Sequence, residues 1–178
     1  MAFNLSTGQR AERKTLITVA EWTEGTGSSA TQVREILGER IPDSDIDYNA
    51  DIETSTDIRG NNFTDVNRTQ PQQTFDPNTI LGGGKLSEKL NDIRRRNALS
   101  ELNQFTVYII TAFKGDSENG YEAEKHTDCT IAYNSIGGES NVDFPYTVYF
   151  SNKITLGKVD KLADDFTFTP DNKKETGL

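Results

Sequence analysis

The segment Asp43-Ser-Asp-Ile-Asp-Tyr-Asn-Ala-Asp-Ile-Glu53 carries acidic or polar residues at its odd positions and, from Ile46, apolar residues at its even positions. Successive side chains of a strand point to opposite faces, so this alternation predicts a strand with all its acids on one face. The strand continues over residues 54–59, turns at Gly60-Asn61-Asn62 and returns over residues 63–75, where Pro71 requires an edge or a bulge. We therefore expect a long acidic hairpin over residues 43–80, with little core of its own.

The same acids also begin like a calcium-binding loop, with oxygen donors at its first, third and fifth positions. Such a loop needs Gly at its sixth position and a bidentate Glu at its twelfth, and this chain has Tyr48 and Thr54 there. The pattern favours an acidic strand face over a calcium site.

Residues 85–102 predict the one helix of the chain. Leu86, Leu90 and Ile93, followed by Ala98, Leu99 and Leu102, form an apolar stripe that we expect to pack on a sheet. The preceding Gly82-Gly-Gly-Lys85 lacks the first Gly and the Ser/Thr of a phosphate-binding loop, so it predicts only a turn into the helix.

The remaining apolar segments predict strands. Residues 14–23 place Leu16, Thr18, Ala20 and Trp22 on one well-buried face, and residues 104–113 are apolar on both faces, which is typical of a central strand. Residues 31–41 fit a helix or a strand equally well. Further strands are expected over residues 121–134, 145–152, 153–162 and 165–169.

Short strands around one helix indicate a β-rich α+β fold, an antiparallel β-sandwich or barrel with a flanking α-helix and a protruding hairpin. The chain has 178 residues, which suits one domain. We expect this domain to span residues 14–170, between a flexible N-terminal arm (residues 1–13) and a flexible C-terminal tail (residues 171–178).

Composition argues against most chemistry. One Cys and one His cannot form a disulfide or a Cys/His zinc site, and a net charge of −9 opposes coating of duplex DNA. His126 and Cys129 are three apart, so a strand would place them on opposite faces, with the His exposed and the Cys half-buried. We expect no enzyme, no metal, no cofactor, no membrane anchor and no secretory signal.

Charge is distributed unevenly along the chain. Residues 39–80 carry nine acidic and three basic side chains, whereas Arg94, Arg95 and Arg96 form a basic patch on the predicted helix. Two interpretations stay open for this patch: a solvated face with local ion pairs, or a surface that meets the acidic segment of another copy.

The order of a strand, a long acidic hairpin, one helix and a run of strands resembles the major tail tube proteins of bacteriophages with long, non-contractile tails, in particular those of Gram-positive hosts. The likeness lies in Asp51-Ile-Glu-Thr-Ser-Thr-Asp-Ile-Arg-Gly60, Phe63-Thr-Asp-Val-Asn-Arg-Thr-Gln-Pro-Gln-Gln-Thr-Phe-Asp-Pro77, the helix from Lys85, and Phe166-Thr-Phe-Thr-Pro170. It covers residues 14–170.

The resemblance implies a structural virion protein, assembled in the host cytoplasm, whose copies form six-membered rings that stack into a hollow tail tube. Its partners would be itself, other tail proteins at the tube ends, and genome DNA that passes without binding. Each subunit would lend hairpins to an inner β-barrel.

On this hypothesis the acidic face lines the lumen, because like charge keeps DNA from binding, while Ile46, Tyr48 and Ile52 pack outward. The lumen-facing candidates are Asp43, Asp45, Asp47, Asp51 and Glu53. The hairpin residues expected between subunits are Arg59, Asn61, Asn62, Phe63, Arg68 and Phe75. The alternative is a non-enzymatic β-sandwich binding module of a virion, such as a tail-tip, decoration, or carbohydrate- or receptor-binding domain.

Overall fold

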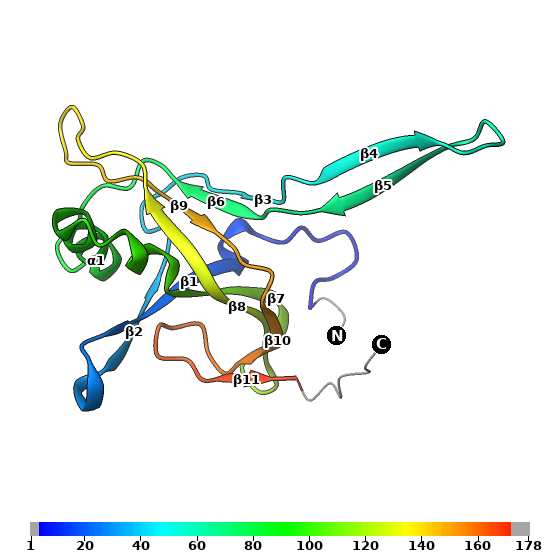
Figure 1. Ribbon diagram of the computed structural model, residues 1–178. Coiled ribbons are helices and arrows are strands. Elements are labelled where there is room, and N and C mark those ends of the chain that lie inside the picture. The colour runs from blue at the N-terminus through cyan, green and yellow to red at the C-terminus, as the bar shows by residue number, and fades with distance from the viewer. Residues whose placement is uncertain (1–3, 172–178) are drawn as a thin grey trace.

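The computed structural model describes residues 4–171 and shows a β-rich molecule with a single α-helix among those residues (Figure 1). In chain order its strands and α-helix are β1 (Leu16–Glu24), β2 (Thr31–Ile36), β3 (Ile46–Asp47), β4 (Asp51–Thr56), β5 (Asn62–Arg68), β6 (Gln72–Phe75), α1 (Lys85–Arg96), β7 (Phe105–Asp116), β8 (Gly120–Tyr133), β9 (Tyr146–Tyr149), β10 (Ile154–Val159) and β11 (Phe168–Pro170). Short 3₁₀ turns lie at Arg13–Thr15, Gly27–Ser29 and Leu99–Asn103.

Nine strands form one open antiparallel sheet in the order β2-β1-β7-β8-β9-β6-β3, with β10 on β8 and β11 on β10. The fold class is the predicted antiparallel α+β one, and the described strands do not close into a barrel. The central position predicted for residues 104–113 is correct, because β7 pairs with β1 on one side and with β8 on the other. The ambiguity over residues 31–41 is resolved in favour of a strand, β2.

Strand β8 changes partner along one edge: its first half pairs with β10 and its second half with β9. Asp128 lies at this change with a left-handed backbone (φ 58°). The irregularity also brings the Cys129 thiol to the carbonyl of His126, and both residues are buried. The prediction of an exposed His126 is therefore wrong: its ring is 2% exposed and stacks edge-on against Phe150.

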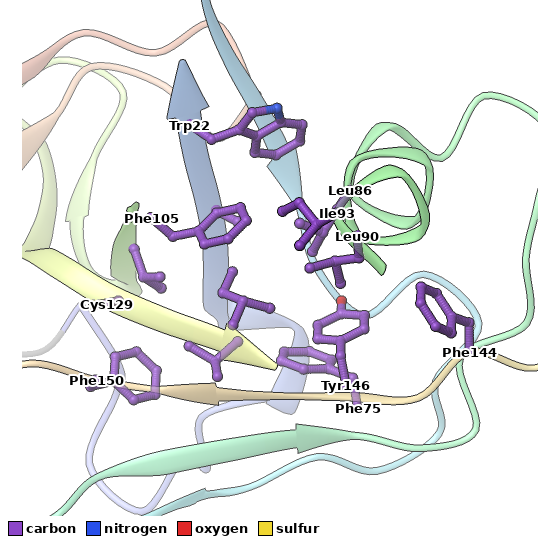
Figure 2. Packing of buried hydrophobic residues seen from close by; sticks show 14 of the residues in the cluster. Trp22, Phe75, Leu86, Leu90, Ile93, Phe105, Cys129, Phe144, Tyr146 and Phe150 are labelled. Atoms are coloured by element: carbon purple, nitrogen blue, oxygen red, sulfur yellow. The ribbon is translucent and has the colours of Figure 1, made fainter. Parts of the chain in front are cut away.

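The main core lies between α1 and one face of the sheet (Figure 2). Leu86, Leu90 and Ile93 of α1 are buried against a cluster that includes Trp22 of β1 and Phe105 of β7. Burial of large apolar side chains like these is the dominant stabilising contribution to folding, about 1.5–3 kcal/mol for each.

The helix ends at Arg96, before the predicted Leu102, because Asn97 adopts a left-handed conformation (φ 53°). Its amide donates to the Arg94 carbonyl and that of Ala98 to the Ile93 carbonyl, which closes the last turn as an Asn C-cap does. Leu99 then falls in a 3₁₀ turn and is exposed, so it is not part of the apolar stripe.

The opposite face of the sheet carries a second, smaller core, which corrects the expectation of a single buried face on β1. Val19 of β1, Tyr108 of β7 and Phe166 are buried together there. The Glu21 carboxylate is also buried, where it accepts from Arg34 and lies 3.3 Å from the Tyr108 hydroxyl. Burial first, and then the Glu21 charge, raise the pKa of Tyr108 to about 12.

The predicted flexible arms fall partly outside the described residues, since residues 1–3 and 172–178 lie beyond them. Within residues 4–13, the Asn4 amide donates to the Phe113 carbonyl and the Arg13 guanidinium donates to the carbonyls of Leu16 and Ser44. These bonds place the described part of the N-terminal segment against the sheet.

Candidate assembly surface

Strands β4 and β5 form a separate two-stranded sheet, here called the arm, that extends away from the rest of the molecule (Figure 1). The arm is the upper part of the long hairpin expected from the sequence, and β3 and β6 are its foot. Every residue of β5 is exposed, and so is all of β4 except Ser55, which is half-buried. A side chain on the arm therefore contacts little besides its cross-strand neighbours.

One face of the arm is uncharged. Ile52 lies opposite Val66, and each is 61% exposed. Next to them, Thr54 and Thr64 stand opposite each other with their hydroxyls 3.2 Å apart, and the Thr56 hydroxyl donates to the side-chain oxygen of Asn62 over 2.8 Å. This neutral face can be buried against protein without leaving a charge unpaired.

The other face of the arm is acidic. Glu53 lies directly opposite Asp65, and a pair of like charges at such a position destabilises a hairpin. The Asn67 amide donates to one Glu53 oxygen over 3.3 Å, and Phe63 stands opposite Ser55 on the same face. Two carboxylates in direct opposition make this face suited to water rather than to protein.

The tip of the arm is an ordered turn. The Asp57 carboxylate accepts from the backbone amides of Arg59 and Asn61 and from the Asn61 side chain, and Gly60 supplies the left-handed conformation that the turn needs. These bonds, the Asn61 amide first, lower the pKa of Asp57. Ile58 projects from this turn with its side chain wholly exposed (106%).

The foot of the hairpin is fixed to the body by a buried polar network. The Thr18 hydroxyl of β1 donates to Gln73 of β6 over 2.8 Å, and the Gln73 amide donates to the Ser44 carbonyl over 3.3 Å. The Ser44 hydroxyl in turn donates to the Thr74 carbonyl. Gln73 is buried, and both its side-chain oxygen and its side-chain nitrogen make hydrogen bonds. This network fixes the orientation of the hairpin foot relative to the body.

The continuous strand predicted over residues 43–53 is broken in the structure. Asp43 and Asp45 precede β3, and Asn49 after it takes a left-handed conformation (φ 42°). The backbone amide of Asn49 donates to the Asp47 carboxylate, and its side-chain amide donates to the Gln70 carbonyl. The pairing register also shifts here, at a bulge: Arg68 is opposite Asp51 and Val66 is opposite Ile52, so Asn67 of β5 has no partner in β4. The five lumen candidates are all exposed, but regular strand alternation relates only Asp51 and Glu53, and Glu53 shares its face with Asp65.

The residues expected to pack outward differ in their burial. Ile46 is half-buried against the main core, whereas Tyr48 and Ile52 are exposed. Tyr48 is 54% exposed, and Ile52, 61% exposed, forms the neutral face with Val66.

Five of the six hairpin residues expected between subunits are exposed on the arm: Arg59, Asn61, Asn62, Phe63 and Arg68. Arg68 lies 3.7 Å from the Asp51 carboxylate across the arm. Phe75 is a correction, because it is 1% exposed and stacks on Tyr146 in the main core (Figure 2), so it is not available to a neighbour. It points inward because β6 lies between β3 and β9 at the foot of the hairpin.

Two of the three arginines of the basic patch on α1 bind neighbouring side chains of the same molecule. Arg96 pairs with Asp92 and Glu101, and Arg94 donates to the Asn91 side chain. Lys89 adds a second cation at Glu101, and Arg96 and Lys89 together lower the pKa of Glu101 to about 2. Within residues 4–171, Arg95 is the exposed member of the patch that makes no ion pair.

Sequence reasoning missed Val66 and Asp65, which help to define the two faces, and Ile58 at the tip. The missing signal was the pairing register, which is set by the bulge and by the turn at residues 57–61 and is not visible in one strand alone. Asn49 offered a signal, since Asn is among the few residues that adopt left-handed backbone readily.

The one Cys and the one His of the chain, Cys129 and His126, are both buried. Within them no group of three or more His, Cys, Asp or Glu side chains could hold a metal ion, and Cys129 is buried with its pKa raised by that burial. His126 Nδ1 contacts the Ser151 carbonyl at 3.0 Å, and Nε2 is buried without a hydrogen bond, 3.4 Å from the Glu124 carboxylate. No described helix is long and apolar enough to cross a membrane.

No protein-family model and no curated protein matches the sequence of this chain. Solved structures do resemble this chain in fold. The anti-feeding prophage cap (AFP tube terminating cap) is 12% identical in sequence and superposes with a TM-score of 0.45, over 87% of this chain and 95% of that one. A PVC sheath-tube complex of an extracellular contractile injection system matches at 14% identity and TM-score 0.39, over 80% and 88% of the two chains. The anti-feeding prophage baseplate matches at 9% identity and TM-score 0.45, over 89% and 100%. Identity and TM-score are too low for these likenesses to carry a role to this chain.

Proposed function

We propose that this chain is a non-enzymatic structural protein of a phage-tail-like particle, in which its copies associate into stacked rings that form a hollow tube. The observation that carries the proposal is the arm, which leaves the body with one neutral face and one acidic face and buries neither. A two-stranded hairpin by itself is only marginally stable in water, so an arm of this kind gains stability when a neighbouring copy covers its neutral face.

The acidic face supports a tube in particular. When the neutral face packs on a neighbouring copy, Glu53 and Asp65 remain on the water-facing side. Carboxylates repel the phosphate backbone and release no counterions, so DNA would pass along such a wall without binding to it. Pairing arms side by side in a ring would also cover the exposed edges of β4 and β5.

The number six for the ring rests on the sequence resemblance to tail tube proteins. The type of tail is not part of the proposal, since the arm suits the tube of a contractile tail as well as that of a non-contractile one. The other partners would be tail proteins at the ends of the tube, and the site of action would be the virion, after assembly in the host cytoplasm.

Electron microscopy of the purified full-length chain tests the proposal. We expect long polymers of uniform bore, with rings of six subunits seen end-on. The matched control replaces residues 52–66 by a short Gly-Ser linker, which removes the arm and leaves the foot, and we expect it to give only discrete folded particles. Discrete particles from the unmodified chain at all concentrations would contradict the proposal and would favour the alternative, a virion binding module.

A further inference from the structure

The tip of the arm presents one bare aliphatic side chain on a preformed support. Ile58 is wholly exposed, and the turn beneath it is fixed by the hydrogen bonds of Asp57. Because these bonds fix the backbone of the turn before binding, the turn loses little conformational entropy when Ile58 enters a partner. Ile58 can therefore insert into a partner, and its side chain is called the knob below.

A hollow of about 310 Å³ lies at the foot of the same hairpin. Its apolar lining includes Ile36 and Phe75, together with Leu16, Leu37 and Ile41, which are partly buried at the edge of the main core. The hollow is large enough for one aliphatic side chain, and a buried aliphatic group stabilises an interface much as it does a core.

The charges beside the knob and beside the hollow are complementary. Arg13 lies at the hollow and donates to the carbonyls of Leu16 and Ser44, and Asp43 lies there too. Asp57 and Arg59 flank the knob. None of these four side chains makes an ion pair within residues 4–171, so each retains its charge for a partner.

We propose that Ile58 of one copy enters the hollow at the hairpin foot of the next copy, with Asp57 facing Arg13 and Arg59 facing Asp43. That the knob comes from a second copy of this chain rests on the proposed function. The contact joins two different surfaces, so it repeats without closing and produces a fibre or a stack of rings. Twelve residues separate Ile46 at the foot from Ile58 at the tip. Because the chain bends at Asn49, a rise of about 3.3 Å per residue gives an upper limit of roughly 40 Å for the repeat.

Cross-linking between two variant chains tests this contact. One chain carries Ile58→Cys and the other carries Ile36→Cys, at a partly exposed residue that lines the hollow. The matched control replaces the second chain by one with Leu156→Cys, an aliphatic residue of similar exposure on β10. The native Cys129 is fully buried and does not compete.

When the two chains are mixed under mild oxidation, we expect several-fold more of the mixed disulfide with Ile36→Cys than with Leu156→Cys. Equal yields would overturn the contact. A second variant, Ile58→Asp, is expected to abolish tubes while the matched Leu156→Asp leaves them intact.

The two readouts separate this contact from the proposed function. The mixed disulfide forms between pairs of chains and needs no tube, so its appearance without tubes would support the contact and contradict the tube. Normal tubes from Ile58→Asp would overturn the contact and leave the tube role standing.

Discussion

The body and the arm of this molecule are stabilised in opposite ways. In the body, Leu90 and Ile93 are completely buried between α1 and the sheet, and Val19 and Tyr108 fill a second core on the far side. In the arm, the corresponding cross-strand pair, Ile52 and Val66, stands in solvent. The body therefore folds by burying its own side chains, whereas the arm leaves its apolar pair exposed, as the proposed contact with another copy requires.

This difference separates the residues that set stability from those that set assembly. A core substitution should affect unfolding first, and an arm substitution should affect association first.

The largest effect is expected in the body. Leu90→Ala removes a wholly buried side chain that packs α1 on the sheet, and leaves a cavity. We expect the free energy of unfolding to fall by about 2–5 kcal/mol, measured by urea denaturation followed by circular dichroism. The matched control, Val66→Ala on the arm, should change it by less than about 0.5 kcal/mol. A similar loss from both variants would contradict the separation.

The next effect concerns assembly. Val66→Asp places a charge in the centre of the neutral face, where a neighbouring copy would have to bury it. We expect polymers to disappear in sedimentation velocity while the unfolding midpoint of the body changes little. Asp65→Asn, at the adjacent residue but on the acidic face, should still assemble. Polymers from Val66→Asp would show that the neutral face is not buried between copies.

A smaller effect is expected at the bend between foot and arm. Asn49→Ala forces an alanine into the left-handed conformation, which costs about 1–2 kcal/mol. The substitution also removes the hydrogen bond from the Asn49 side chain to the Gln70 carbonyl. We expect faster amide exchange across β4 and β5 with unchanged exchange in β7, measured by mass spectrometry. Asn49→Gly, which accepts the backbone without strain, should restore most of the protection; equal exchange in both variants would argue against backbone strain as the cause.

The smallest effect is the pH response of Glu101. Its pKa is lowered to about 2 by Arg96 first and Lys89 second, so its contribution is present above the ordinary carboxyl value near 4.5 and is lost as the pH falls toward 2. Because the pair lies at the surface, we expect Glu101→Gln to cost at most about 1 kcal/mol at pH 7. The difference between the two chains should shrink below pH 4.5 in acid titrations of unfolding. A difference that grows on acidification would contradict this assignment.

Much of the body could be predicted from the sequence because its patterns are local. The stripe Leu86, Leu90, Ile93 sets the buried face of α1, and the two apolar faces of residues 104–113 set β7 in the middle of the sheet. The early end of α1 could not be predicted from that stripe, since the apolar residues continue beyond the left-handed Asn97. The second core escaped prediction because it depends on Phe166, which is distant in sequence from β1.

The assembly surface was predicted only in outline. The acidic alternation located the hairpin, but a single left-handed residue, Asn49, and a bulge decide which side chains share a face. Phe75 was misplaced because the pattern does not show where the hairpin foot enters the sheet. Register and strand order are non-local, and these two properties set the faces of the arm.

Hydrogen exchange of the arm, compared between dispersed and assembled chains, shows whether another copy covers the arm. We expect the amides of β4 and β5 to exchange much faster than those of β7 in the dispersed chain, because the arm buries almost nothing of its own. In assembled material the same amides should become strongly protected while β7 changes little. An arm that exchanges equally fast in both states would contradict the claim that its exposed surface exists to be covered by another copy.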